Sequence, residues 1–278
     1  MRKILTAALL LTGPIASADW FEDIRDSGNN EDLYRTLYYM PKGGDLHNHL
    51  SGSNYSEWMW ELALKEQERG YQYYTKVRIE NCVEYGSNEY GGNAYFLLFR
   101  NITAIDYDAL SDCEKSEYKR LQDLDEREIA GWMDSVRLDK PYEGRDEFFS
   151  THWNRMGALG NNPWFQAETL FLNMQAFGEE GLSYLETMVS VAGMESPDGT
   201  AISAEETVEI LRKRITAADA RATGVTTRFQ IEILRFHPAA EDMMRFVYKF
   251  VHENDDMIVG VKMVGREDNE KCYPLRFQ

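Results

Sequence analysis

The C-terminal part of the chain alternates between short apolar runs and longer amphipathic runs, and this alternation limits the fold more than any other feature. Apolar runs of strand length cover 182–191, 226–234 and 257–264. Segments with helical periodicity lie between them, over 203–220 and 238–253. Strand, helix, strand, helix, strand at this spacing predicts βαβ units in a parallel sheet.

Parallel βαβ units occur in two kinds of α/β fold, which are open doubly wound sheets and closed (β/α)₈ barrels of the TIM type. No GxGxxG motif follows any of the predicted strands, so a dinucleotide-binding fold has no direct support. We find no internal repeat and no low-complexity segment.

The preceding part of the chain is predicted to be mostly helical. The expected helices are 31–39, 53–70, 123–133, 146–159 and 163–177. A short strand is expected between the first two, where residues 42–50 run into a loop rich in glycine and histidine. Residues 71–122 differ, because a loose strand pattern over 71–79 is followed by the turn-like run GSNEYGGN. We interpret 71–122 as an insertion after the first strand of the main domain.

The first 18 residues have the three regions of an export signal in the right order. Arg2 and Lys3 form a basic start, an apolar run follows, and Ala16-Ser17-Ala18 matches the small residues before a cleavage point. The mature protein would then begin near Asp19 and comprise a domain over 19–278. No later apolar run approaches the roughly 20 residues that cross a bilayer. We therefore expect a periplasmic or secreted protein with no membrane association after signal removal.

The charge of the chain argues against nucleic acid as a partner. The formal net charge is −17, and no basic run follows the first three residues. Binding to a polyanion requires clustered lysine and arginine. The sequence therefore favours a small-molecule ligand over DNA or RNA.

Three cysteines occur, and an oxidising compartment permits a disulfide between two of them. Cys82 and Cys113 flank one polar stretch and are the favoured pair, which would leave Cys272 alone. The alternative is that all three are free thiols, and the sequence leaves the two interpretations nearly equal.

The residues that most suggest chemistry are His47 and His49. Two residues separated by one position on a strand point to the same side, so both imidazoles can reach one metal ion. Neutral imidazole suits Zn²⁺. An isolated HxH is weak evidence, but the glycine at 52 permits close approach of a ligand to the backbone. At the end of a barrel strand, the pair would face the end where such barrels carry their active sites.

The surroundings of this pair resemble the opening motif of the adenosine deaminase family. The motif here is Pro41-Lys42-x-x-Asp45-Leu46-His47-x-His49-Leu50-x-Gly52. The end of the chain, Val259 to Asp268 (VGVKMVGRED), resembles the fourth-strand motif of that family. The export signal and the insertion at 71–122 are similar to features of its secreted, growth-factor-like branch. The resemblance implies a zinc-containing (β/α)₈ barrel, of which about the first four β/α units are present.

This resemblance implies roles for individual residues. His47 and His49 would be zinc ligands, and His49, Ser51 and Gly265 would border the substrate. Two positions depart from the family pattern: Ser51 replaces a usual acidic residue near the ribose, and Lys262 stands where an acidic residue is common. Both departures weaken the expectation of strict adenosine specificity.

The family's third zinc histidine and its catalytic glutamate belong to later strands, so the catalytic acid and base are expected beyond Gln278 and no catalytic residue is assigned within the chain. We expect hydrolytic deamination of adenosine, or a related purine nucleoside, to inosine and ammonia by a longer protein of which this chain is a truncated form. One alternative is a non-catalytic half-barrel that binds purine or a partner chain. Another is a different amidohydrolase that also begins with HxH. A half-barrel would be expected to pair, as a homodimer or with a separately encoded C-terminal half.

Overall fold

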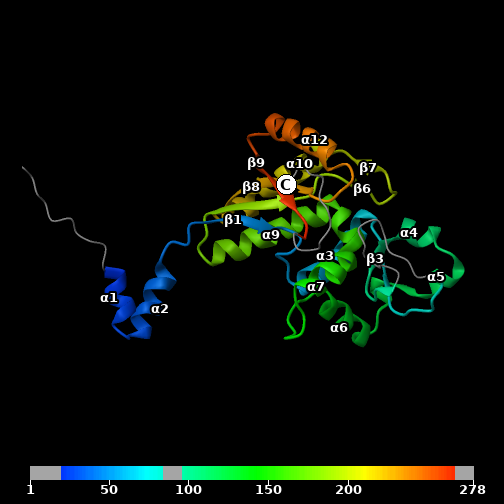
Figure 1. The fold of residues 1–278 in the computed structure, drawn as a ribbon, viewed down its shortest axis with the longest axis horizontal. Helices are drawn as coiled ribbons and strands as arrows, with labels where there is room; N and C mark the ends of the chain where they lie inside the picture. The colour runs from blue at the N-terminus through cyan, green and yellow to red at the C-terminus, as the bar shows by residue number, and fades with distance from the viewer. Residues whose placement is uncertain (1–19, 84–95, 267–278) are drawn as a thin grey trace, which may run out of the picture. The chain divides into compact units, whose positions relative to one another are not determined.

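The computed structural model describes residues 20–83 and 96–266 (Figure 1). The export signal, the start at Asp19, the GSNEYGGN turn, Cys272 and the last two residues of the VGRED motif lie outside these ranges. The chain divides into two compact units, 1–41 and 42–278. The first unit contains helices α1 (Trp20–Asp26) and α2 (Asn30–Tyr39). Asn29 begins α2 by accepting hydrogen bonds from the backbone N–H groups of Glu31 and Asp32.

The second unit is built on a four-stranded parallel sheet. Its strands are β1 (Gly44–His49), β5 (Tyr184–Val189), β8 (Thr226–Leu234) and β9 (Ile258–Val264). Their order in the sheet follows their order in the chain, and each neighbouring pair is parallel. In doubly wound sheets the strand order reverses at a switch point, whereas in a barrel it is sequential. The four strands therefore have the arrangement of an arc of a (β/α)₈ barrel, and the predicted α/β parallel sheet is confirmed.

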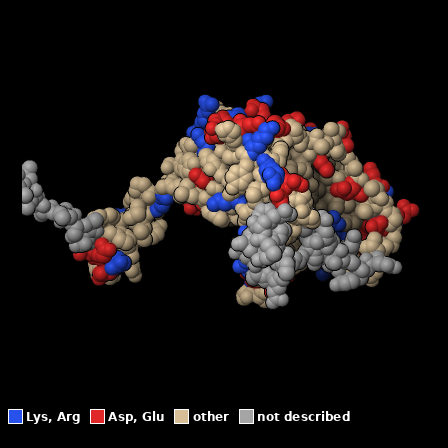
Figure 2. Space-filling model, turned by 45° about the horizontal axis from the view of Figure 1, so that its top comes forward, with Lys and Arg blue, Asp and Glu red and all other residues tan. Residues whose placement is uncertain are grey.

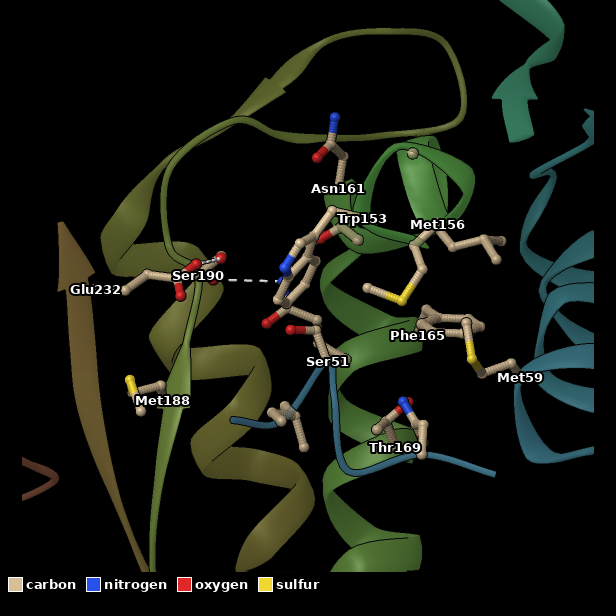
Figure 3. Close-up of a pocket in the computed structure, with 16 residues that line it drawn as sticks. Ser51, Met59, Trp153, Met156, Asn161, Phe165, Thr169, Met188, Ser190 and Glu232 are labelled. Atoms are coloured by element: carbon tan, nitrogen blue, oxygen red, sulfur yellow. Dashed lines mark hydrogen bonds between the residues drawn. The ribbon is translucent and has the colours of Figure 1, made fainter. Parts of the chain in front are cut away.

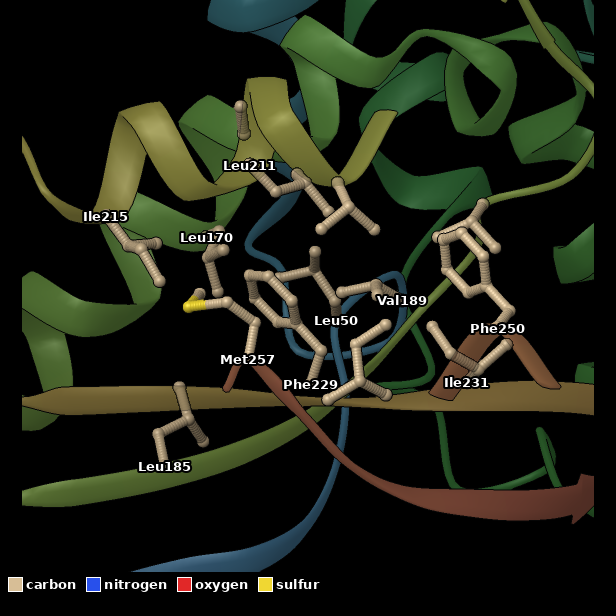
Figure 4. Packing of buried hydrophobic residues seen from close by; sticks show 14 of the residues in the cluster. Leu50, Leu170, Leu185, Val189, Leu211, Ile215, Phe229, Ile231, Phe250 and Met257 are labelled. Carbon is tan, nitrogen blue, oxygen red and sulfur yellow. The ribbon is translucent and has the colours of Figure 1, made fainter. Parts of the chain in front are cut away.

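Helices α9 (Pro163–Glu179), α10 (Ala204–Ile215) and α12 (Ala240–Glu253) supply the apolar side chains that cover one face of this sheet. Figure 4 shows Leu170, Leu211 and Ile215 packed against Phe229 and Leu185 of the strands. These side chains form one continuous hydrophobic core. Each crossover helix thus buries its apolar stripe on the same side of the sheet, as in a barrel.

Alternation along the strands explains why only one face is apolar. In β8, Phe229, Ile231 and Ile233 are buried in the core. The intervening Gln230 and Glu232 point to the opposite face, because successive side chains of a strand alternate. The sheet therefore has an apolar face against the helices and a polar face on the other side.

A smaller antiparallel sheet lies within the region interpreted as an insertion. Its strands are β2 (Tyr73–Lys76), β3 (Asn101–Thr103) and β4 (Tyr118–Arg120), in the order β3-β2-β4. Short helices α4 (Ala104–Ala109) and α5 (Asp112–Ser116) connect β3 to β4. Cys82 and Cys113 are joined by a disulfide. A buried ion pair between Lys76 and Glu117, 2.5 Å apart, also links this region.

The remaining elements lie in the connections between these strands and helices. They are α3 (Ser56–Lys65), η1 (Glu66–Arg69), η3 (Leu121–Asp123), α6 (Glu126–Ser135), β6 (Met194–Glu195), β7 (Ala201–Ile202) and α11 (Ala218–Ala222). No helix in the described part of the chain is long and apolar enough to span a membrane. On the face seen in Figure 2, acidic and basic side chains lie together at the top, and mainly acidic ones appear toward the right.

Three predicted helices are not single α-helices, and one of them, 53–70, consists of α3 and the 3₁₀ turn η1. Residues 146–159 form α7 (Arg145–Glu147), a π-helical turn η4 (Phe148–His152), α8 (Trp153–Met156) and a 3₁₀ turn η5 (Gly157–Asn161). Gly157 has φ +43°, and a Cβ there would collide with the backbone carbonyl of Asn101. The predicted helix 203–220 ends at Ile215, and the hydroxyl of Thr216 donates to the carbonyl of Arg212 at 2.8 Å.

Candidate metal and ligand site

The candidate site begins at the carboxyl end of β1, where the strand departs from regular pairing with β5. The register shifts between Asp45 and Asn48. The side chain of Asp45 accepts the backbone N–H of His47 at 2.9 Å. Asn48 is buried, and its side-chain oxygen accepts hydrogen bonds from Thr187 at 2.8 Å and from Ser53 at 3.0 Å. These bonds fix the short segment that carries the two histidines.

His47 and His49 both line a cleft of about 1070 Å³ on the polar side of the sheet. Their ring centroids are 5.6 Å apart. The cleft also receives side chains from β8, β9, α12 and the π-helical turn, including Glu232, Lys262 and Phe149. Its position at the carboxyl ends of parallel strands is where (β/α)₈ proteins bind ligands.

The surroundings of His49 favour its neutral form. Partial burial lowers the pKa of His49 below its ordinary value, and the charges of His47 and Lys262 act in the same direction. The carboxylate of Glu232 opposes this shift but is outweighed. Ser190 donates its hydroxyl to Glu232, which holds that carboxylate in place. A neutral imidazole keeps a free lone pair, which metal coordination requires.

The separation of the two imidazole rings can be compared with that of two imidazoles on one zinc ion. With Zn–N distances of about 2.0–2.1 Å and tetrahedral angles, two imidazoles on one ion have ring centres about 5 Å apart. The observed 5.6 Å is close to that separation. A catalytic zinc normally has three protein ligands. Within residues 20–83 and 96–266, no group of three or more His, Cys, Asp or Glu side chains is placed to hold a metal ion.

Ser51 lies in a second, smaller cavity of about 250 Å³ rather than in the lining of the histidine cleft. This cavity lies between the loop after β1, the end of β5 and helix α9 (Figure 3). Trp153, Met188, Ser190 and Glu232 line both spaces. The cavity therefore adjoins the cleft and shares one wall with it.

Gly265, the other residue expected to border a substrate, lines the histidine cleft. Its φ of +105° is one that residues with a Cβ rarely adopt. A Cβ at this position would also lie 2.7 Å from Cε1 of Phe236 and 3.0 Å from Cδ1 of Leu234. The chain can thus turn tightly at the cleft only because this residue is glycine.

Several residues that the sequence analysis did not assign to the site belong to it. Glu232 and Ser190 line both the cleft and the smaller cavity, and Glu232 is close enough to His49 to affect its pKa. Asn54 and Thr169 line the smaller cavity. Glu232 had a signal in the sequence, since Arg228, Gln230 and Glu232 alternate with apolar residues along one strand. Asn54 and Thr169 had none, because they meet only in the folded chain.

Other polar groups near the site have structural partners. Glu186, on the polar face, accepts hydrogen bonds from the hydroxyl of Tyr184 at 2.9 Å and from Nε2 of Gln230 at 2.6 Å. His152 is buried in the π-helical turn, and its Nε2 contacts the carbonyl oxygen of Arg137 at 2.5 Å. The structure therefore uses these two residues to hold neighbouring segments together.

Comparison with known proteins supports the fold. The sequence matches no family profile and no curated protein. The structure aligns with a zinc-containing amidohydrolase from Burkholderia ambifaria at a TM-score of 0.50 and 12% identity, over 85% of this chain and 47% of that one. It also aligns with adenine deaminase from Arthrobacter aurescens at a TM-score of 0.47 and 14% identity, over 83% of this chain and 50% of that one.

The chain thus spans about half the length of the solved structures that it matches. At such low identity, the alignment with the amidohydrolase bears on the fold alone. The chain has an α/β fold whose parallel sheet resembles part of an amidohydrolase barrel.

Proposed function

We propose that this chain carries the first metal-binding segment of a zinc-dependent hydrolase that deaminates adenosine, or a related purine nucleoside, to inosine and ammonia. The observation that carries the proposal is that His47 and His49 line one cleft at the carboxyl end of the sheet, with their rings close together. The motif around the pair and the amidohydrolase-like fold agree with this assignment.

In this proposal, the chain's own residues bind the metal ion and orient the substrate. His47 and His49 would hold the zinc ion, and the ion would supply an activated water for attack on the purine. In that reaction the water oxygen would bond to C6, and one water proton would pass to the ring nitrogen N1. The other water proton would pass to the amino group, which leaves as ammonia when its bond to C6 breaks. The proposal assigns the remaining zinc ligand and the acid that protonates the ring to a part of the protein, or a partner chain, other than the described residues.

The lack of a third metal ligand among the described residues motivates a second candidate function. Because the described residues include no set of three ligands, a non-catalytic module that binds a purine or a partner chain fits them as well. Such a module would bind its ligand in the same cleft without turnover. Pairing with a second copy or with another chain would complete either version, and size-exclusion chromatography reports it directly.

The export of the protein is a proposal as well. The disulfide between Cys82 and Cys113 supports it, because disulfides persist outside reducing compartments. Cell fractionation checks it: the proposal expects the protein in the periplasm or medium, and cytoplasmic protein with free thiols would contradict it.

The experiment that tests the function follows adenosine absorbance with zinc-supplied protein that includes the part, or the partner chain, to which the remaining ligand and the acid are assigned. Turnover to inosine and ammonia that disappears in His47→Ala would support the deaminase. Adenosine binding without turnover would favour the binding module. A folded, zinc-supplied protein that neither binds nor converts adenosine would contradict both, and a panel of other cyclic amides and amidines would then test the wider amidohydrolase alternative.

A further inference from the structure

Lys262 places a positive charge in the histidine cleft. Its neighbour on β9, Met263, packs against the core, so the lysine side chain points to the opposite, polar side of the sheet. Lys262 lines the cleft. Its charge is also close enough to His49 to help lower the pKa of that imidazole. Strand geometry, the lining of the cleft and the effect on His49 therefore agree on where the ammonium group lies.

No carboxylate in the described part of the chain forms an ion pair with this ammonium group. The nearest candidate is Glu232, which lies beside Lys262 in the register of β8 and β9. Glu232 instead accepts the hydroxyl of Ser190. Lys262 is partly buried, and a charge that loses water without gaining a counter-ion is costly. A ligand with a negatively charged group would supply that counter-ion.

Further basic side chains lie around the same part of the cleft. Arg235 lines it and donates to two backbone carbonyl oxygens of β9. The guanidinium groups of Arg145 and Arg266 lie 5.6 and 6.0 Å from the ring centroid of Phe149, which lines the cleft as well. Asp146 pairs with Arg266 at 2.5 Å. Basic side chains thus outnumber acidic ones in this group, although the formal net charge of the chain is −17. A ligand in the cleft responds mainly to these local charges, because salt screens distant ones.

The cleft is large enough for a ring and a charged group in one ligand. Its volume of about 1070 Å³ is at the upper end of the roughly 300–1,000 Å³ of typical ligand pockets. The aromatic rings of Phe148, Phe149 and Trp153 line it and suit a planar heterocycle. Because Lys262 and His49 line the same space, one molecule can reach both.

We propose that Lys262 is a specificity-determining residue, which makes the histidine cleft select a ligand that carries a phosphate or carboxylate group over the same ligand without it. An ammonium group recognises either oxyanion as a compact charge with three hydrogen-bond donors. The selection of an anion rests on the charges of the cleft alone. The purine part of the ligand rests on the proposed function, which this inference narrows from nucleosides to their anionic derivatives.

The chain offers a matched control for the charge of Lys262. The side chain of Lys249 on α12 is 74% exposed, and it does not line the cleft. Lys262→Met and Lys249→Met each remove one positive charge and keep a side chain of similar length. Neither lysine belongs to the core, so both variants should fold, which circular dichroism checks. Lys262→Arg keeps the charge and serves as the rescuing variant.

The test measures binding of adenosine 5′-monophosphate, adenosine 5′-carboxylate and adenosine to the zinc-supplied protein by calorimetry. We expect at least one of the two anionic compounds to bind at least about tenfold more tightly than adenosine, as a hydrogen bond to a charged group would give. Lys262→Met should remove this preference and leave adenosine affinity unchanged. Lys262→Arg and Lys249→Met should both keep it. A preference for the phosphate alone would identify phosphate as the recognised group, and a preference for both compounds would identify an oxyanion of either kind.

The outcomes separate the role of Lys262 from the proposed function. An anion preference that is lost in Lys262→Met, in protein that deaminates none of the three compounds, would keep the role of Lys262 and reject the deaminase. Deamination of adenosine by protein that binds all three compounds equally, or whose anion preference survives in Lys262→Met, would reject the role of Lys262 and keep the deaminase. Folded protein that binds none of the three would overturn both.

Discussion

The two faces of the parallel sheet are made by alternate residues of the same strands, yet they have opposite properties. On the helix side, Phe229, Ile231 and Ile233 are almost completely buried in one core. On the other side, Glu186, Gln230 and Glu232 are joined by hydrogen bonds to neighbouring polar groups. We infer that the helix side supplies stability and the polar side supplies the site, a division that substitutions on each face can test.

The largest effect is expected for Phe229→Ala. This side chain is fully buried in the core, so its removal leaves a cavity and should lower the free energy of unfolding by about 3–5 kcal/mol. Chemical denaturation followed by circular dichroism measures the loss. Phe246→Ala is the matched control, because Phe246 is 47% exposed, and it should cost less than about 1 kcal/mol. Equal losses in the two variants would show that the helix-covered face is not the main source of stability.

An intermediate effect is expected at Asn48, which lies between the two histidines but points to the buried side. Asn48→Ala removes the acceptor of the Thr187 hydroxyl, which is fully buried, and should cost about 1–3 kcal/mol. Adding Thr187→Val to Asn48→Ala should lower the free energy of unfolding little further, because both side chains take part in the same hydrogen bond. Additive losses in the double variant would mean that this hydrogen bond does not link β1 to β5 as described.

The smallest effect is expected on the polar face. Lys262→Ala should change the free energy of unfolding by no more than about 0.5 kcal/mol, because its side chain adds nothing to the core. Its neighbour Met263 packs against the core, so Met263→Ala should cost about 1–2 kcal/mol. Thermal unfolding of both variants side by side provides the comparison. A larger loss of unfolding free energy in Lys262→Ala than in Met263→Ala would assign a structural role to the polar face.

Much of this sheet could be predicted from the sequence, because the pattern of a buried strand is local. The strand 226–234 has the predicted bounds, and the parallel arrangement followed from the alternation of strands and helices. The segment 146–159 could not be predicted. Its helix α8 ends at Gly157, where the backbone conformation depends on close contact with Asn101, distant in the sequence.

The candidate site was predictable only where its residues are close together in the sequence. His47 and His49 lie on one strand, and their shared orientation follows from strand geometry. The smaller cavity, which Asn54 and Thr169 line, lies between a loop after β1 and the middle of α9, and no spacing in the sequence brings these residues together. Whether His47 and His49 hold zinc stays a prediction.

Calorimetry of zinc binding to the purified protein near pH 7.5 is the direct test of the metal site in the histidine cleft. We predict that one zinc ion binds per chain, and that His47→Ala/His49→Ala weakens this binding at least about tenfold, or about 1.4 kcal/mol. His252→Ala, which removes an exposed histidine from α12, should leave zinc affinity unchanged. Zinc affinity that is the same in the double variant and the unmodified protein would contradict the assignment of this cleft as a metal site.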